Sequence, residues 1–150
     1  KDETGTPRNY LAELHEKADR MGIGRSILWM DPCADISSLF GASDVVVLPS
    51  LWSEPFGRVL IEAMSCGVPA VGSRVGGIPE VLSGDFSSFT FKPGDADELA
   101  EILFRLKGWR ESNPDLSRRC RNHVLQNFTI DRTVRQVEEI FLKTVQKNQS

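Results

Sequence analysis

The segment Asp44-Val-Val-Val-Leu-Pro49 restricts the fold of this chain more than any other feature. Its four apolar residues form an uninterrupted, mostly β-branched run that a proline closes. A strand that is apolar on both faces is typical of a parallel sheet covered by helices on either side. Amphipathic helical patterns precede and follow this run, and short strands alternate with helices further along. This alternation predicts an α/β fold, a doubly wound parallel sheet.

The other elements are predicted from the spacing of apolar residues. Helices are expected over residues 7–21, 36–42, 57–66, 78–82, 96–106, 116–127 and 130–145, and further strands over 27–30, 69–71 and 89–91. The first expected element is a helix, although a doubly wound domain usually begins with a strand. Either the sheet is small, or one or two strands that belong before Lys1 are missing.

Composition excludes several classes of protein. The 150 residues suit one domain, 1–150, with a single core. With 18 basic and 21 acidic side chains the net charge is −3, so no basic field attracts nucleic acid or anionic lipid. The longest apolar run is far too short to cross a bilayer. The three cysteines, Cys33, Cys66 and Cys120, form no CxxC pair, which argues against a disulfide framework and favours a reducing, cytoplasmic compartment.

The turn that follows the 44–49 strand has the properties of an anion site. Open α/β sheets bind ligands at the carboxyl ends of their strands. Here the loop 50–56 leads into a helix at Gly57, a residue whose backbone can approach a ligand closely. The first N–H groups of that helix, at Gly57, Arg58 and Val59, lack partners within the helix and lie at its positive end. This arrangement favours a phosphate group.

Two carboxylates flank this anion site. Glu54 precedes the helix, and Glu62 lies about 6 Å beyond Arg58 on the same helical face. A carboxylate can accept hydrogen bonds from both hydroxyls of a vicinal diol. The order of carboxylate, free amides and carboxylate therefore matches a ligand with a hydroxylated group on each side of a phosphate linkage. Nucleotide diphosphate sugars have this layout.

The segment Glu54-Pro-Phe-Gly-Arg-Val-Leu-Ile-Glu62 resembles the E-x7-E signature of retaining GT-B glycosyltransferases, in particular family 4. The resemblance extends over residues 42–50, 63–72, 76–80, 92–100 and 128–131, and so covers most of the chain. It implies the Rossmann-like C-terminal domain of such an enzyme. It also implies transfer of a sugar from a nucleotide diphosphate sugar with retention of configuration, without a metal or other cofactor. A UDP-sugar is the expected donor, with GDP- and ADP-sugars as alternatives.

The resemblance also implies a role for each residue of the motif. Glu62 would hold the ribose hydroxyls, and Glu54 would contact the transferred sugar beside the reacting carbon as the catalytic residue. The amides of Phe56, Gly57, Arg58 and Val59 would hold the diphosphate, with Pro55 completing the donor site. The nucleotide base would lie beside Met30, Asp31, Pro32 and Cys33. These residues depart from the glycine-containing turn that the family usually has there.

The same resemblance implies that part of the enzyme lies outside these residues. The family has an N-terminal domain for the acceptor, and an arginine and a lysine that clamp the diphosphate before the region matched here. We therefore expect a donor-binding fragment of a two-domain enzyme, inactive alone, whose acceptor is a sugar or lipid-linked glycan. The basic cluster at Arg118, Arg119 and Arg121 is expected to be a solvated face. A peripheral contact with the inner membrane face is the alternative.

Simpler interpretations remain for several residues. Glu62 alone would be an ordinary surface glutamate, and Glu54 a loop acid beside a proline. Asp95-Ala-Asp97 matches a DxD metal pattern, but Glu98 makes a helix-capping box with Asp95 the preferred interpretation, and no metal is expected. Two other functions stay open. One is a retaining phosphorylase or a sucrose- or trehalose-type synthase of the same fold, and the other is a non-catalytic nucleotide-binding or protein-interaction module.

Overall fold

The computed structural model describes residues 8–147 and divides the chain into two compact units, 1–34 and 35–150. Each unit is described by itself. In the first, helix α1 (Arg8–Arg20) is followed by Gly22, whose φ of 69° reverses the chain, and by the 3-10 turn η1 (Gly24–Ser26). Within this unit the rings of His15 and Trp29 lie 4.4 Å apart.

The prediction of a strand at Ile27–Met30 is wrong. The segment is irregular, and its side chains at Leu28 and Met30 are exposed. A strand requires a hydrogen-bonded neighbour, and residues 8–34 contain no other strand to pair with it. An apolar run is therefore not sufficient to make a strand here.

The second unit is built on the predicted parallel sheet. Its strands are β1 (Val46–Leu48), β2 (Ala70–Ser73) and β3 (Thr90–Phe91), in the spatial order β1-β2-β3. Both pairings are parallel, with Val47 opposite Val71 and Gly72 opposite Thr90. All of β2 is buried, whereas β1 is only half-buried because it lies at an edge of the sheet. The fully covered strand is thus β2, not the apolar run 44–49.

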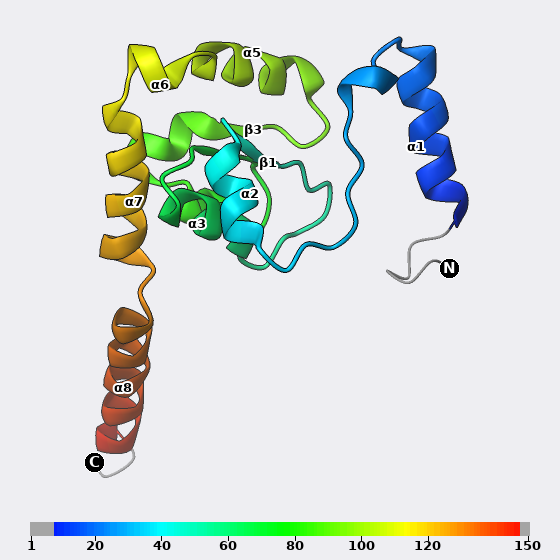
Figure 1. Cartoon of the computed structure of the whole chain (residues 1–150). Coiled ribbons are helices and arrows are strands. Elements are labelled where there is room, and N and C mark those ends of the chain that lie inside the picture. Colours follow the sequence, from blue (N-terminus) through cyan, green and yellow to red (C-terminus); the bar gives the residue numbers. More distant parts are fainter. Residues whose placement is uncertain (1–7, 148–150) are drawn as a thin grey trace. The chain divides into compact units, whose positions relative to one another are not determined.

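Helices cover both sides of this sheet. Figure 1 shows α5 on one side of the strands and α3 on the other. The predicted helices are confirmed, with small shifts at some ends; the 3-10 segments η1 and η2 and the helix α6 were not predicted. The elements are α2 (Ile36–Ala42), α3 (Arg58–Ser65), α4 (Ile78–Val81), η2 (Gly84–Phe89, 3-10), α5 (Ala96–Leu106), α6 (Trp109–Ser112), α7 (Asp115–Asn127) and α8 (Ile130–Lys147).

The core of this unit lies between the sheet, α3 and α7. Leu60 and Met64 of α3 are fully buried, as are Val71 of β2 and Cys120 of α7. The indole N–H of Trp109 donates to the carbonyl oxygen of Asp44 at 2.8 Å, which fixes the short helix α6 beside the start of β1. The result is a rigid support for the loops at the other end of the strands.

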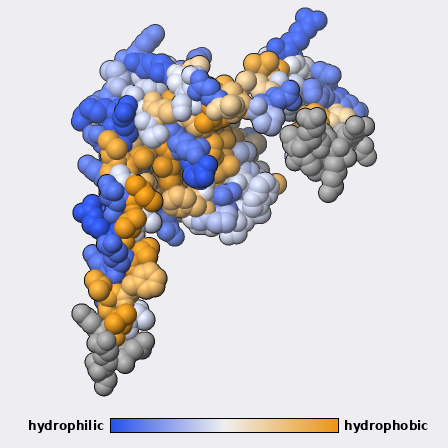
Figure 2. Space-filling model, turned by 60° about the horizontal axis from the view of Figure 1, so that its bottom comes forward, coloured by the Kyte–Doolittle hydropathy of each residue, from blue (hydrophilic) through white to orange (hydrophobic). Residues whose placement is uncertain are grey.

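Helix α8 carries an uncovered apolar face. Figure 2 shows hydrophobic side chains along its length. The exposed apolar residues of α8 are Ile130, Val134, Val137, Ile140, Phe141, Leu142 and Val145. Within residues 8–147, no helix combines the length and the apolar character needed to cross a bilayer.

Candidate functional site

The carboxyl ends of the three strands form one edge of the sheet, and the loops that follow the strands are joined there by hydrogen bonds. Ser73 at the end of β2 donates its hydroxyl to the carbonyl oxygen of Ser50, which follows β1, at 2.6 Å. The next residue, Arg74, donates its backbone N–H to the carbonyl oxygen of Phe91 in β3 at 2.7 Å. The sheet edge predicted to bind the ligand is therefore one connected surface.

The loop after β2 supports the loop that carries Glu54. The N–H of Gly77 donates to the carbonyl oxygen of Glu54 at 2.8 Å. A Cβ on Gly76 would collide with the backbone of Glu54, and one on Gly77 with the backbone of Pro55, so only glycine fits at either position. In the sequence, this glycine pair stands out only as part of the resemblance over residues 76–80. Two adjacent glycines in the loop after a buried strand are the sequence signal for a close approach of two backbone segments.

Gly57 is the N-cap residue of helix α3 and has φ 74° and ψ 47°. L-residues other than glycine rarely adopt this left-handed conformation. Its α-carbon also packs inward, because an added Cβ would lie 3.3 Å from the side chains of Leu48, Leu60 and Ile78. Gly57 is therefore required by the backbone turn and by the core as well as by any close approach of a ligand.

Glu54 and the start of α3 are in direct contact. The side-chain Oε1 of Glu54 accepts a hydrogen bond from the N–H of Gly57 at 3.3 Å, and the N–H of Leu60 donates to the carbonyl oxygen of Gly57 at 2.9 Å. The N–H groups of Arg58 and Val59 belong to the first turn, where the helix provides no acceptor. A carboxylate thus already lies at the positive end of this helix, as expected for an anion-binding turn.

Glu62 lies one turn further along the same helix, as predicted. Its Oε1 accepts from Nε of Arg58 at 2.8 Å. The Arg58 side chain is 82% exposed and that of Glu62 is 38% exposed, so water screens the pair. An exposed ion pair of this kind contributes little to stability and leaves Glu62 accessible to a polar ligand.

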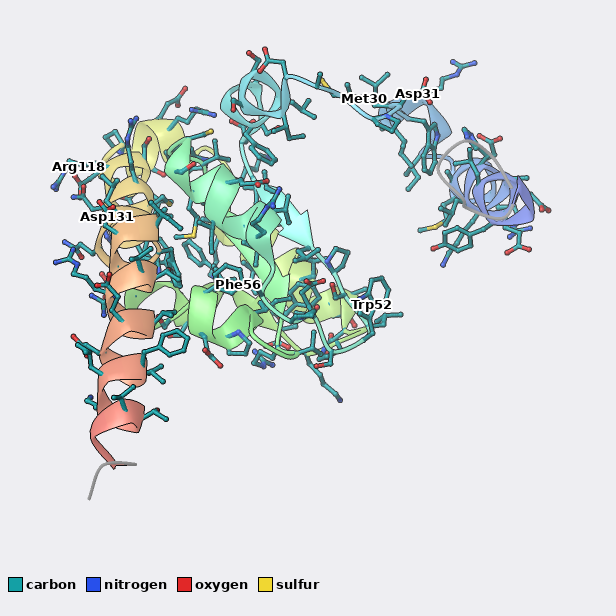
Figure 3. All side chains as sticks on the ribbon, turned by 90° about the horizontal axis from the view of Figure 1, so that it is seen from below. Met30, Asp31, Trp52, Phe56, Arg118 and Asp131 are labelled. Carbon is teal, nitrogen blue, oxygen red and sulfur yellow. The ribbon has the colours of Figure 1, made fainter. Side chains whose placement is uncertain are left out.

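Two large aromatic side chains extend from the loop around Glu54. Trp52 is 67% exposed and Phe56 is 46% exposed, and Figure 3 labels both. Close to Trp52 in sequence, Leu51 lines a hollow of about 200 Å³ with residues of β3 and of the loop that follows it. The sheet edge therefore presents apolar surface beside its polar turn.

The segment expected to lie beside a nucleotide base belongs to the first unit. It comprises Met30, Asp31, Pro32 and Cys33, all of them exposed and irregular, and Figure 3 labels the first two. The turn at Gly57 belongs to the second unit, and contact of this segment with it stays a prediction. The structure brings together the other predicted donor-binding residues, which are Glu54, Pro55, Phe56, Gly57, Arg58, Val59 and Glu62.

Asp95 caps helix α5, and half of the predicted capping box is present. Its Oδ1 accepts from the N–H of Glu98 at 3.0 Å. The Glu98 carboxylate does not return to Asp95 but accepts from the N–H of Lys92 at 2.6 Å and from the Arg74 guanidinium at 2.8 Å. The backbone bond from Lys92 and then the bond from Arg74 lower the pKa of Glu98. Within residues 8–147, no cluster of three His, Cys, Asp or Glu side chains is arranged to hold a metal.

The basic cluster on α7 is partly neutralised by acidic neighbours. Arg118 pairs with Asp115 at 2.7 Å, and Arg119 pairs with Asp85 at 2.8 Å. These pairs are solvent-exposed, which agrees with the interpretation as a solvated face.

The fold is that of a Rossmann-like domain of GT-B glycosyltransferases, and comparison with known proteins identifies the family. The model of the family "Glycosyl transferases group 1" matches residues 7–123. The chain belongs to this family, which confirms the resemblance drawn from the sequence.

Relatives of known activity are similar over most of the chain. The N-acetyl-alpha-D-glucosaminyl L-malate synthase of Bacillus anthracis is 35% identical over 77% of this chain and 30% of its own length. The UDP-Gal:alpha-D-GlcNAc-diphosphoundecaprenol alpha-1,3-galactosyltransferase of Escherichia coli is 30% identical over 91% of this chain and 33% of its own length. The chain thus spans about a third of the length of these enzymes.

Solved structures agree with the fold. The Anabaena protein Alr3699/HepE in complex with UDP has a TM-score of 0.81 and 30% identity, and covers 91% of this chain and 37% of its own. The same protein has also been solved with UDP-glucose. The sucrose-phosphate synthase of Thermosynechococcus elongatus has a TM-score of 0.78 but only 23% identity, and shows the shared fold alone.

Proposed function

We propose that this chain is the donor-binding domain of a glycosyltransferase that moves a sugar from a nucleotide diphosphate sugar to an acceptor with retention of configuration. The observation that carries the proposal is the arrangement of Glu54, Gly57 and Glu62 around the start of α3, in a chain of this family. A UDP-sugar is the preferred donor. The names of the Escherichia coli relative and of the Anabaena complexes support this choice.

In this proposal the start of α3 binds the diphosphate. The N–H groups of Phe56, Gly57, Arg58 and Val59 face the ligand, and the helix dipole favours its negative charge. Glu54 leaves the N–H of Gly57, its partner in the free protein at 3.3 Å, and turns towards the transferred sugar. Because these donors are fixed before the reaction, they stabilise the charge that develops on the leaving diphosphate, and no metal is needed.

Glu62 binds the ribose in the same proposal. Its Oε1 accepts from Arg58, so Oε2 is the oxygen that meets the two ribose hydroxyls first. A charge-assisted bond to these hydroxyls is stronger than a neutral one. The residues Met30, Asp31, Pro32 and Cys33 complete the base side of the site.

The acceptor binds outside these residues. We propose that a further domain binds an acceptor sugar or lipid-linked glycan, and that the apolar face of α8 packs against that domain. The exposure of Val134, Val137 and Phe141 in the free chain supports this, since such a face is normally covered. Peripheral contact with the inner membrane face is a secondary proposal, because Arg118 and Arg119 are already paired with acids.

Calorimetry tests the donor proposal. The chain, and a form extended by the sequence that precedes Lys1, are titrated with UDP, GDP and ADP and with their glucose esters in the presence of EDTA. We expect UDP to bind most tightly and EDTA to have no effect. Binding by neither form would refute the proposal, and binding that EDTA abolishes would refute metal independence. For the extended form, the anomeric configuration of a product measured by NMR decides retention.

A further inference from the structure

The aromatic ring of Phe56 lies against a ring from a distant part of the chain. The centroids of Phe56 and Phe128 are 6.0 Å apart with an interplanar angle of 69°, an edge-to-face pair. This is the geometry that aromatic pairs prefer. Phe56 directly precedes Gly57, where α3 begins. Phe128 stands at the opposite end of the second unit's sequence, between α7 and α8.

Phe128 is itself held in place. It ends α7, where its N–H donates to the carbonyl oxygen of Val124 at 2.8 Å. Its ring lies 5.7 Å from that of His123, and His123 is anchored by a 2.8 Å hydrogen bond between Nε2 and the carbonyl oxygen of Val81. His123 also contacts the buried ring of Phe86 at 4.9 Å. A line of contacts therefore runs from the core to Phe128.

Phe56 has much less support of its own. Its side chain is 46% exposed, and its neighbours in sequence are Pro55, which is also exposed, and Gly57. The left-handed Gly57 has no side chain that could contact the ring of Phe56. The ring of Phe128 is thus a contact that restrains the side chain of Phe56 and, through it, the peptide groups on either side.

We propose that Phe128 is a positioning residue for the donor site: through the ring of Phe56 it fixes the orientation of the N–H groups at Phe56 and Gly57. This inference rests on the proposed function, which assigns those N–H groups to the diphosphate. Phe128 does not touch the donor. It lowers the conformational freedom that the turn would otherwise lose on binding, and so raises affinity by preorganisation.

Substitution of Phe128 by leucine, which keeps an apolar side chain but removes the ring, tests the proposal. We expect the UDP dissociation constant to rise by about three- to tenfold, the factor that corresponds to the usual strength of an aromatic pair. Phe128→Tyr, which keeps the ring, should retain the wild-type constant. Phe56→Leu should raise the constant similarly, and Phe56→Leu with Phe128→Leu should be no worse than either single change.

Phe89→Leu is the matched control. Phe89 packs edge-on against Phe86 at 5.7 Å, so its loss disturbs the same aromatic cluster without reaching Phe56. This variant should lower the midpoint of thermal unfolding and leave the UDP dissociation constant unchanged. The proposal is overturned if Phe128→Leu binds UDP as the wild type does, if Phe89→Leu weakens binding equally, or if the effects at Phe56 and Phe128 are additive.

Amide hydrogen exchange separates this inference from the proposed function. In the absence of any nucleotide, the N–H groups of Phe56 and Gly57 should exchange at least threefold faster in Phe128→Leu than in the wild type, and at the wild-type rate in Phe89→Leu. If the wild-type protein binds no nucleotide, the proposed function fails and exchange still tests the positioning. Unchanged exchange at both N–H groups overturns the positioning role, whatever the protein binds.

Discussion

The N–H of Gly77 donates a 2.8 Å hydrogen bond to the carbonyl oxygen of Glu54, which joins the loop after β2 to the loop that enters α3. The bond is made possible by Gly76, whose α-carbon faces the Glu54 backbone at φ 51° with no room for a side chain. The position of Glu54 therefore depends on a residue pair well separated from it in the sequence.

Gly76→Ala should displace Glu54 and destabilise the protein. The added Cβ meets the Glu54 backbone and forces a residue with a side chain into a left-handed conformation. We expect the free energy of unfolding to fall by about 1–3 kcal/mol in urea titrations. Gly41→Ala is the control, because Gly41 lies in α2 with open space around it and alanine favours helices. Equal stability of the Gly76 variant and wild type would contradict the structure.

Glu62 and Glu54 should affect different parts of donor binding. Glu62→Ala should weaken binding of UDP by about 1–3 kcal/mol, because charge-assisted hydrogen bonds to the ribose are lost. Glu54→Ala should leave the affinity for bare UDP unchanged while damaging sugar transfer in an active form of the enzyme. Calorimetry measures both affinities, with Glu101→Ala on the exposed face of α5 as the control. Equal loss of UDP affinity in the two site variants would disprove this division.

Cys120 should be chemically inert in the folded protein. Burial raises the pKa of its thiol to about 12, so it stays protonated at pH 8. Cys33 and Cys66 are exposed. Ellman's reagent at pH 8 should therefore titrate two thiols rapidly, and the third only after guanidinium unfolds the protein. Rapid reaction of all three thiols in the native state would show that the core around α7 is open.

Asp95 should act as a helix cap rather than as a metal ligand. Asp95→Ala removes the 3.0 Å bond from the N–H of Glu98 and should cost about 1 kcal/mol of stability. Asp97→Ala, which keeps the cap, should cost less. Thermal unfolding with and without Mn²⁺ measures both effects. Stabilisation of wild type by Mn²⁺ that is lost in both variants would instead support a metal site.

Glu98 should make part of the stability depend on pH. Its pKa is lowered by the bonds from Lys92 and Arg74, so the folded protein binds this proton less readily than the unfolded chain. Its contribution is therefore complete above the ordinary value of 4.5 and declines as the pH falls through the lowered pKa. Urea titrations between pH 6 and pH 3 should show a shallower decline for Glu98→Gln than for wild type. Identical pH profiles would contradict this role.

Much of the secondary structure could be predicted because its causes are local. The periodic apolar residues of α5 and the cap at Asp95 lie within one short segment, and the prediction of residues 96–106 matches the structure. The helix over 36–42 was likewise predicted with its observed bounds. The four-residue helix α6 was missed because it is too short to show a period. Its position depends on the bond from Trp109 to Asp44.

The candidate site was predicted only in part. Glu54, Gly57 and Glu62 lie within nine consecutive residues, so helix geometry alone placed them around one turn. Gly77 and Phe128 contact the same turn from elsewhere in the chain, and no local pattern announces such contacts. The apolar run Ile27–Met30 was predicted as a strand and is not one, because a strand also needs a neighbouring strand to pair with, and the run itself carries no information about that partner.

The sequence by itself determined the alternation of strands and helices, the closeness of Glu54, Gly57 and Glu62 to one turn, and the family of the chain, because all three depend on neighbouring residues. Only the tertiary structure decided that β2 is the buried strand, that a glycine pair supports Glu54 and that Phe128 packs against Phe56. Those outcomes depend on which segments come together when the core closes. The free energy of forming the core depends on the whole set of contacts and not on any one segment of the sequence.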